Sequence, residues 1–244
     1  LGARRTPVYV KGTALFVPST QYSVPRVAYS AHVAPRSSER CLQRFQILRE
    51  VLDLCLTESA GASDFLGGVR AGQQGLEIAE SMADPSLQES ANLYLAQVLH
   101  WVGDYRRGAA LLRQNVVGLE EELRRRGIQS RQAVNSRTFL GWCLAELGEF
   151  PEAIARTDET VALSEAADRA YWLVHAYCGS GLVHLRRGEF ARATDVAELA
   201  VELCRGRDFT ALWAIPAAIL GAAHARAGRD ADALASYSKV IEHY

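Results

Sequence analysis

The sequence predicts an all-α fold, a right-handed solenoid of about five helix-turn-helix hairpins, with a poorly ordered N-terminal arm. A glycine-centred pattern recurs every 40 to 45 residues between residues 96 and 233, and repetition at such a period is typical of solenoids. Helical periodicity runs from residue 40 to the end, whereas residues 1–40 lack it. Hydrophobic residues make up 49% and charged residues 23% of the chain, which is the composition of a folded protein.

The N-terminal arm, residues 1–40, differs from the rest of the chain in composition and charge. It carries four prolines, and its six basic residues stand against one acid, Glu39, for a net charge of +5. Two short apolar runs, 8–10 and 14–17, have strand-like composition. We expect a linker or disordered arm here and a helical repeat domain over residues 41–244.

The repeat is centred on a glycine that follows an amphipathic run. The helix before such a glycine ends in a left-handed cap, and an acid directly after it favours the start of the next helix. Small residues five positions after and seven positions before each glycine let the two helices approach closely. The glycines are Gly103, Gly148, Gly188 and Gly228; the later small residues are Gly108, Ala153, Ala193 and Ala233; the earlier ones are Ala96, Gly141, Gly181 and Gly221.

The register divides the chain into hairpins. Asp84, Asp168 and Asp208 fall where one hairpin ends and the next begins. The hairpins are expected at about 41–83, 86–125, 131–166, 169–205 and 209–244. Because glycine is a poor helix former, the four glycines between residues 67 and 75 predict that the first hairpin is the least stable. Pro216 lies inside the last expected first helix, where proline kinks or shortens a helix.

The small–x6–Gly–x–aromatic–x2–Ala pattern resembles the tetratricopeptide repeat (TPR) superfamily. It is clearest over 141–153 and 181–193, and the resemblance covers about 200 of the 244 residues. The blocks 103–115 and 137–150 look like the C-terminal repeats of bacterial multidomain proteins that join a class III adenylate or guanylate cyclase and an ATPase module to TPRs. Neither cyclase nor ATPase motifs occur in this chain, so any catalytic domain of that kind would lie upstream. The chain begins at Leu1 rather than Met, and we expect a fragment or processed form of something longer.

No catalytic or cofactor motif is recognisable. The sequence lacks a GxxxxGK[ST] loop, an HExxH helix and a GxSxG elbow. Its five cysteines form no CxxC pair, which favours free thiols in a reducing cytoplasm over a zinc site or a disulfide framework. The net charge of −1 and the lack of a long apolar run argue against nucleic acid and membrane as partners. We expect a cytoplasmic protein that is not an enzyme and needs no cofactor or metal.

The resemblance implies that the first helix of each hairpin lines a concave groove. The positions thirteen, ten, six, three and two residues before each glycine should face inward. Tryptophans there suit binding hot spots, asparagine suits a peptide backbone, and arginine suits carboxylates; the alternative for the tryptophans is ordinary hairpin core. The candidate groove residues are Gln97, His100, Trp101, Asn135, Thr138, Trp142, Glu146, His175, Arg186 and Arg226.

The sequence favours a protein–protein interaction scaffold and leaves two alternatives open. As a scaffold, it would bind a peptide or helix in the groove, or dock on and regulate its own upstream domain. As a sensor, it would bind a small ligand and relay its presence to an upstream cyclase, ATPase or DNA-binding domain. As a spacer, it would form a homodimer through the apolar C-terminal hairpin.

Overall fold

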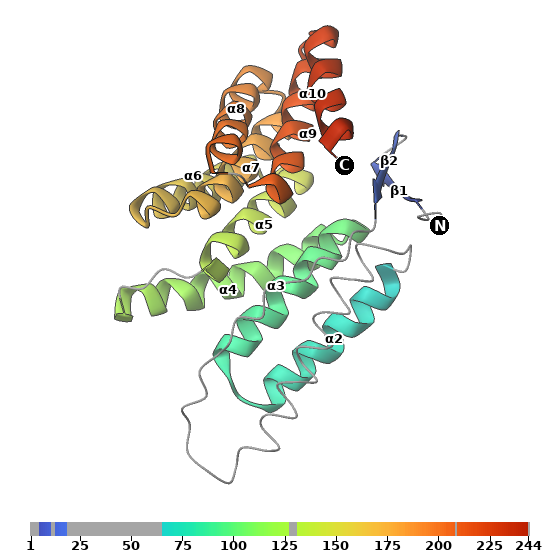
Figure 1. The fold of residues 1–244 in the computed structure, drawn as a ribbon. Helices are drawn as coiled ribbons and strands as arrows, with labels where there is room; N and C mark the ends of the chain where they lie inside the picture. The colour runs from blue at the N-terminus through green and yellow to red at the C-terminus, as the bar shows by residue number, and fades with distance from the viewer. Residues whose placement is uncertain (1–4, 11–12, 19–64, 127–130, 208, 244) are drawn as a thin grey trace.

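A computed structural model describes residues 5–10, 13–18, 65–126, 131–207 and 209–243 (Figure 1). Within the arm, strands β1 (Arg5–Val10) and β2 (Thr13–Pro18) form an antiparallel pair. They contain the two apolar runs that the composition marked as strand-like. The rest of the arm, the boundary at residue 40 and the expected helix over 41–58 lie outside the described residues.

From residue 65 onward the described chain is a succession of helices that pack in order (Figure 1). The expected all-α repeat fold is confirmed, with each hairpin formed by α3 and α4, α5 and α6, α7 and α8, or α9 and α10. The helices are α2 (Phe65–Ser81), α3 (Pro85–Val102), α4 (Tyr105–Arg126), α5 (Arg131–Leu147), α6 (Phe150–Ala166), α7 (Ala170–Arg187), α8 (Phe190–Arg207), α9 (Thr210–Arg226) and α10 (Asp230–His243).

The repeat glycines form the turns inside the hairpins. Gly103, Gly148, Gly188 and Gly228 have φ values of 87°, 79°, 90° and 75°. At the first turn, the N–H of Asp104 donates to the carbonyl of Leu99 at 2.8 Å, and the N–H of Gly103 donates to that of His100 at 3.2 Å. This pair of bonds is the Schellman motif, and it recurs at the other three turns.

The acids next to the turns and junctions act differently from one another. Asp84 caps α3, because its carboxylate accepts from the N–H groups of Ser86 and Leu87. Glu149 makes no side-chain cap. Glu189 turns back to His184, with 2.7 Å between Oε2 and Nδ1. The expectation that each acid caps the following helix therefore holds only in part.

Small residues bring the helices of each hairpin together. A Cβ at Gly141 would lie 2.7 Å from Cγ2 of Thr157, closer than real packing allows. The backbone of α5 therefore packs against α6 at a position where only glycine fits. Three core clusters lie along the described helices: one around Ala79 and Ala91, one around Leu112 and Leu144, and one around Val174 and Ala197. Trp142 packs against both of the last two clusters and so joins the α5–α6 hairpin to the α7–α8 hairpin.

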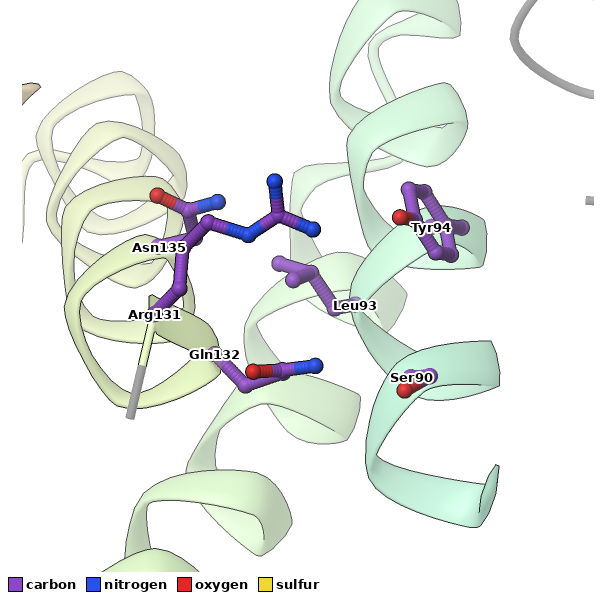
Figure 2. A pocket seen from close by; sticks show the side chains of 6 residues that line it. All are labelled: Ser90, Leu93, Tyr94, Arg131, Gln132 and Asn135. Carbon is purple, nitrogen blue, oxygen red and sulfur yellow. The ribbon is translucent and has the colours of Figure 1, made fainter. Parts of the chain in front are cut away.

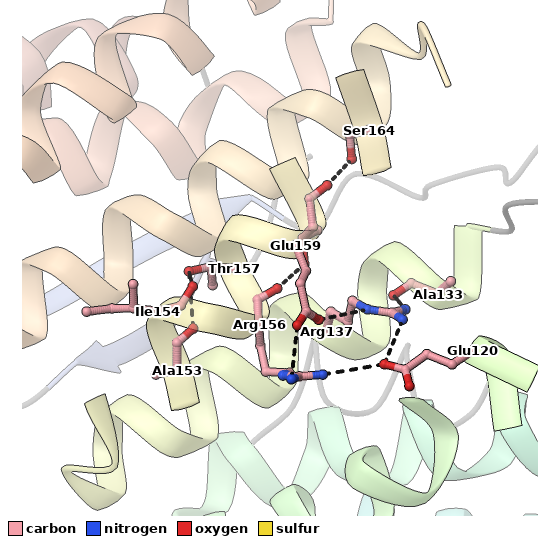
Figure 3. A network of polar contacts seen from close by, with 10 residues as sticks. Glu120, Ala133, Arg137, Ala153, Ile154, Arg156, Thr157, Glu159 and Ser164 are labelled. Atoms are coloured by element: carbon pink, nitrogen blue, oxygen red, sulfur yellow. Dashed lines mark hydrogen bonds and ion pairs between the residues drawn. The ribbon is translucent and has the colours of Figure 1, made fainter. Parts of the chain in front are cut away.

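A buried arginine links three helices at the junction between α4 and α6 (Figure 3). The side chain of Arg137 on α5 is 3% exposed and lies 3.3 Å from Glu120 of α4 and 3.6 Å from Glu159 of α6. Arg156 contacts the same two carboxylates at 3.5 and 3.0 Å. Glu120 therefore serves tertiary structure rather than a local pair on the solvated end of α4.

Three further expectations concern the cysteines, Pro216 and membrane-spanning segments. Cys143, Cys178 and Cys204 are free and buried, as expected for structural thiols. Pro216 lies within α9, which begins at Thr210 and not after the proline. Within the helices that the structure describes, none has both the length and the apolar character of a membrane-spanning segment.

Candidate partner-binding face

The first helices of successive hairpins pack side by side, α3 on α5, α5 on α7 and α7 on α9. We call the surface that they form the first-helix face. A helix repeats its direction every three to four residues, so residues four apart on α3 or α5 present side chains to the same side. The expected groove residues all belong to the helices that form the first-helix face.

A pocket of about 160 Å³ opens between α3 and α5 on this face (Figure 2). In Figure 2 the side chains of Arg131 and Asn135 extend from α5 toward α3, and Leu93 projects from the facing helix. Hydroxyl, amide and guanidinium groups dominate its wall, and no acid lines it among the described residues. The lining residues are Ser90, Leu93, Tyr94, Arg131, Gln132 and Asn135.

A buried amide network joins α3 and α5, the two helices that line the pocket, to α4. Asn115 of α4 is 2% exposed and accepts a bond from Nδ2 of Asn92 on α3 at 3.0 Å. Its own Nδ2 donates to the carbonyl of Glu89 at 2.7 Å and to the hydroxyl of Ser136 on α5 at 3.3 Å. Because buried polar groups lose much when unpaired, this network sets the relative position of α3, α4 and α5.

An aromatic cluster occupies the other end of α3 and α5. The ring of His100 lies 5.3 Å from Tyr105, 6.3 Å from Phe139 and 5.9 Å from Trp142, between centroids. Burial lowers the pKa of His100 to about 4, despite the nearby carboxylate of Glu146. Nε1 of Trp142 is buried without a hydrogen-bond partner among the described residues. His100 and Trp142 thus serve largely as packing in this part of the face.

The charged and titratable candidate residues differ in whether their side chains are free to contact a partner. Nε of Arg186 on α7 donates to Oε1 of Glu146 on α5 at 2.5 Å, so both groups are already paired between hairpins. Arg226 at the end of α9 is exposed. His175 lies 4.9 Å from the ring of Tyr171, and burial lowers its pKa to about 4, with the charge of Arg131 acting in the same direction.

The remaining candidates divide between buried and exposed. Thr138 is 1% exposed and faces α7, where a Cβ at Gly179 would lie 3.1 Å from its Cγ2. Gln97 is 8% exposed, and Trp101 is 44% exposed. A partner on the surface can reach Trp101 directly, but Thr138 only after α5 and α7 separate.

The structure brings Asn135 alone of the expected residues into the pocket, and it adds Ser90, Tyr94, Arg131 and Gln132. Part of this was visible in the sequence. Ser90 stands thirteen residues before its repeat glycine, as Asn135 does, and Arg131 is one turn before Asn135. Tyr94 and Gln132 carry no such signal, because their exposure depends on the spacing between α3 and α5.

The two repeat-equivalent histidines are not equivalent in the fold. His184 is 1% exposed and bonded to Glu189. His224 is 7% exposed, and neither of its nitrogens has a hydrogen-bond partner among the described residues. The difference follows from the residue five positions on, which is Glu189 in one repeat and Arg229 in the next. No group of His, Cys, Asp and Glu able to hold a metal occurs in the described part of the chain.

Comparison with known proteins bears on the fold. No family model and no curated protein matches the sequence. Among solved structures, a Rap protein complexed with Competence and Sporulation Factor is 13% identical with a TM-score of 0.69, over 81% of this chain and 54% of that one. PlcR of Bacillus thuringiensis, in complex with the peptide PapR7 and DNA, is 14% identical with a TM-score of 0.65, over 84% and 70%.

A third similar structure is a putative kinesin light chain of Podosopora anserina with nearly identical TPR-like repeats. It is 15% identical with a TM-score of 0.56, over 80% of this chain and 94% of that one. This chain thus spans about half of the Rap protein but nearly all of the kinesin light chain fragment. Together with the repeated turns, these likenesses show that the chain has the fold of TPR-like helical repeat proteins.

Proposed function

We propose that the first-helix face binds an extended protein segment, and that the pocket between α3 and α5 is its anchor. The observation that carries the proposal is the chemistry of that pocket. Ser90, Gln132 and Asn135 offer hydroxyl and amide groups from two consecutive hairpins, and side-chain amides suit an extended peptide backbone. Arg131, with no acid beside it in the described lining, suits a carboxylate of the segment.

The size of the pocket favours a protein segment over a small ligand. Sites for small molecules occupy about 300–1,000 Å³, whereas this pocket holds about 160 Å³. Such a volume fits one side chain of a larger partner, while the rest of the segment runs along α5 and α7. Two proteins with a similar fold were solved in complexes, a Rap protein with Competence and Sporulation Factor and PlcR with the peptide PapR7 and DNA. The segment could belong to another protein or to a domain upstream of this chain.

The test selects peptides on the folded chain from a random phage-displayed library and measures the affinity of the selected sequences by fluorescence polarisation. Asn135→Ala and Arg131→Gln should each weaken binding about tenfold or more, the cost of losing one hydrogen bond to a charged or buried group. Arg106→Gln on exposed α4 is the matched control and should leave affinity unchanged. The proposal fails if selected peptides bind both pocket variants as well as they bind the unaltered chain.

A further inference from the structure

A second hollow lies away from the first-helix face, between the second helices α2 and α4 and over α3. We call it the α2–α4 groove; its volume is about 410 Å³. Leu76 of α2, Leu95 of α3 and Ala110 of α4 give it an apolar floor, while Glu77 and Glu80 stand on its α2 wall. Both glutamates are exposed, and neither has an ion-pair partner among the described residues.

The corresponding furrow between α4 and α6 is closed by an ion pair. Nη2 of Arg113 on α4 lies 2.8 Å from Glu149 and 2.6 Å from Glu152, both at the start of α6. Glu152 stands four residues after its repeat glycine, and Arg107 occupies that position in the preceding repeat. An acid is thus replaced by a base, and the bridge that closes one furrow is not formed across the other.

The charges along the α2–α4 groove are therefore left for a partner. Arg107 on the α4 wall has one described ion-pair contact, 3.6 Å from Asp104, the residue directly before α4, and its side chain is 53% exposed. The opposite wall presents the two carboxylates of Glu77 and Glu80. Exposed charges of opposite sign on two walls, separated by an apolar floor, favour an occupant with the complementary arrangement.

We propose that the α2–α4 groove docks an amphipathic helical segment of a partner protein, with aliphatic side chains on the floor and lysine or arginine toward Glu77 and Glu80. Helices bind to apolar grooves through side chains spaced by three or four residues, and the charged flanks set their orientation. This site is separate from the pocket between α3 and α5, so the chain holds two different segments at once, one on each side of α3.

The experiment uses the full chain and two synthetic helical peptides with the same leucine face, one with lysine and one with glutamate on the polar face. Binding is followed by fluorescence anisotropy. The lysine peptide should bind the unaltered chain, and Ala110→Trp should weaken it tenfold or more by filling the groove at an exposed position. Ala191→Trp, at an exposed alanine of α8, is the matched control and should have no effect.

A charge reversal makes the test specific. Glu77→Lys with Glu80→Lys should reverse the preference toward the glutamate peptide, and Glu77→Gln with Glu80→Gln should weaken the lysine peptide about 2- to 30-fold, as expected for two exposed ion pairs. Glu198→Lys on exposed α8 controls for net charge. Equal binding in the presence of Ala110→Trp, or an equal loss with Ala191→Trp or Glu198→Lys, overturns the proposal. A loss caused by Asn135→Ala overturns it too, because the peptide would then lie on the first-helix face.

Discussion

Arg137 allows the value of a buried charge to be measured in this fold. Its guanidinium is almost fully buried at 3% exposure, yet Glu120 and Glu159 remain 39% and 40% exposed. Desolvation lowers the pKa of Arg137, and the two carboxylates oppose that shift only in part. The arginine therefore bears most of the desolvation cost, and the glutamates bear little of it.

Two sets of substitutions should have very different costs. Arg137→Met keeps the aliphatic volume and removes the buried charge, while Glu120 and Glu159 stay hydrated and keep Arg156 as a partner. We expect a change in unfolding free energy within about 1 kcal/mol, since replacing a buried ion pair by an apolar residue is often neutral. Glu120→Gln with Glu159→Gln leaves Arg137 charged and unpaired, which costs about 3–5 kcal/mol.

Urea and thermal unfolding followed by circular dichroism distinguish the two cases. At about 2–4 °C per kcal/mol for a chain of this length, the double glutamine variant should melt about 6–20 °C lower. Adding Arg137→Met to that variant should restore most of the loss, because it removes the unpaired charge. The reasoning is refuted if Arg137→Met alone costs more than the double glutamine variant, since the ion pairs would then be net stabilising.

Two further predictions test packing and burial. Gly141→Leu should destabilise the chain by about 1–3 kcal/mol through overpacking, whereas Gly206→Leu, where a Cβ meets no atom within 4 Å, should be neutral or stabilising in the same urea assay. His100 and His175 have pKa values of about 4 in the folded chain, against 6.5 for an unperturbed histidine, so the unfolded chain binds protons that the folded one does not. Stability should therefore fall as the pH drops from about 6.5 toward 4, by about 2 kcal/mol per histidine at pH 5; His175→Gln should remove about half of that slope, and an unchanged slope would contradict it.

The positions of the helices can be predicted from local sequence features, namely apolar periodicity and the repeat glycines. The helix expected over 131–147 is found at Arg131–Leu147, because a glycine with positive φ must end it and the apolar periodicity spans its length. The division into a basic arm and a repeat domain stays a prediction, since residues 19–64 are not described. The homodimer also stays a prediction, although the C-terminal hairpin leaves Leu234 67% exposed and Ile215 41% exposed.

The contacts between hairpins were much less predictable. Nothing in the local sequence around Glu120 indicates that its carboxylate reaches Arg137 and Arg156, 17 and 36 residues away. Arg186 and Glu146, both expected in the groove, bond each other although they are 40 residues apart. Such pairs depend on how far each hairpin turns relative to its neighbour, and no local pattern encodes that rotation.

The position of the pocket follows from side-chain size at one repeat register. Between α5 and α7, Thr138 packs on Gly179, and these helices are in closer contact than α3 and α5. The residues at the same two repeat positions between α3 and α5 are Leu93 and Phe139, which belong to one core cluster. Two bulky side chains in place of threonine and glycine hold α3 and α5 apart, and the space left above Leu93 is the pocket that Asn135 lines.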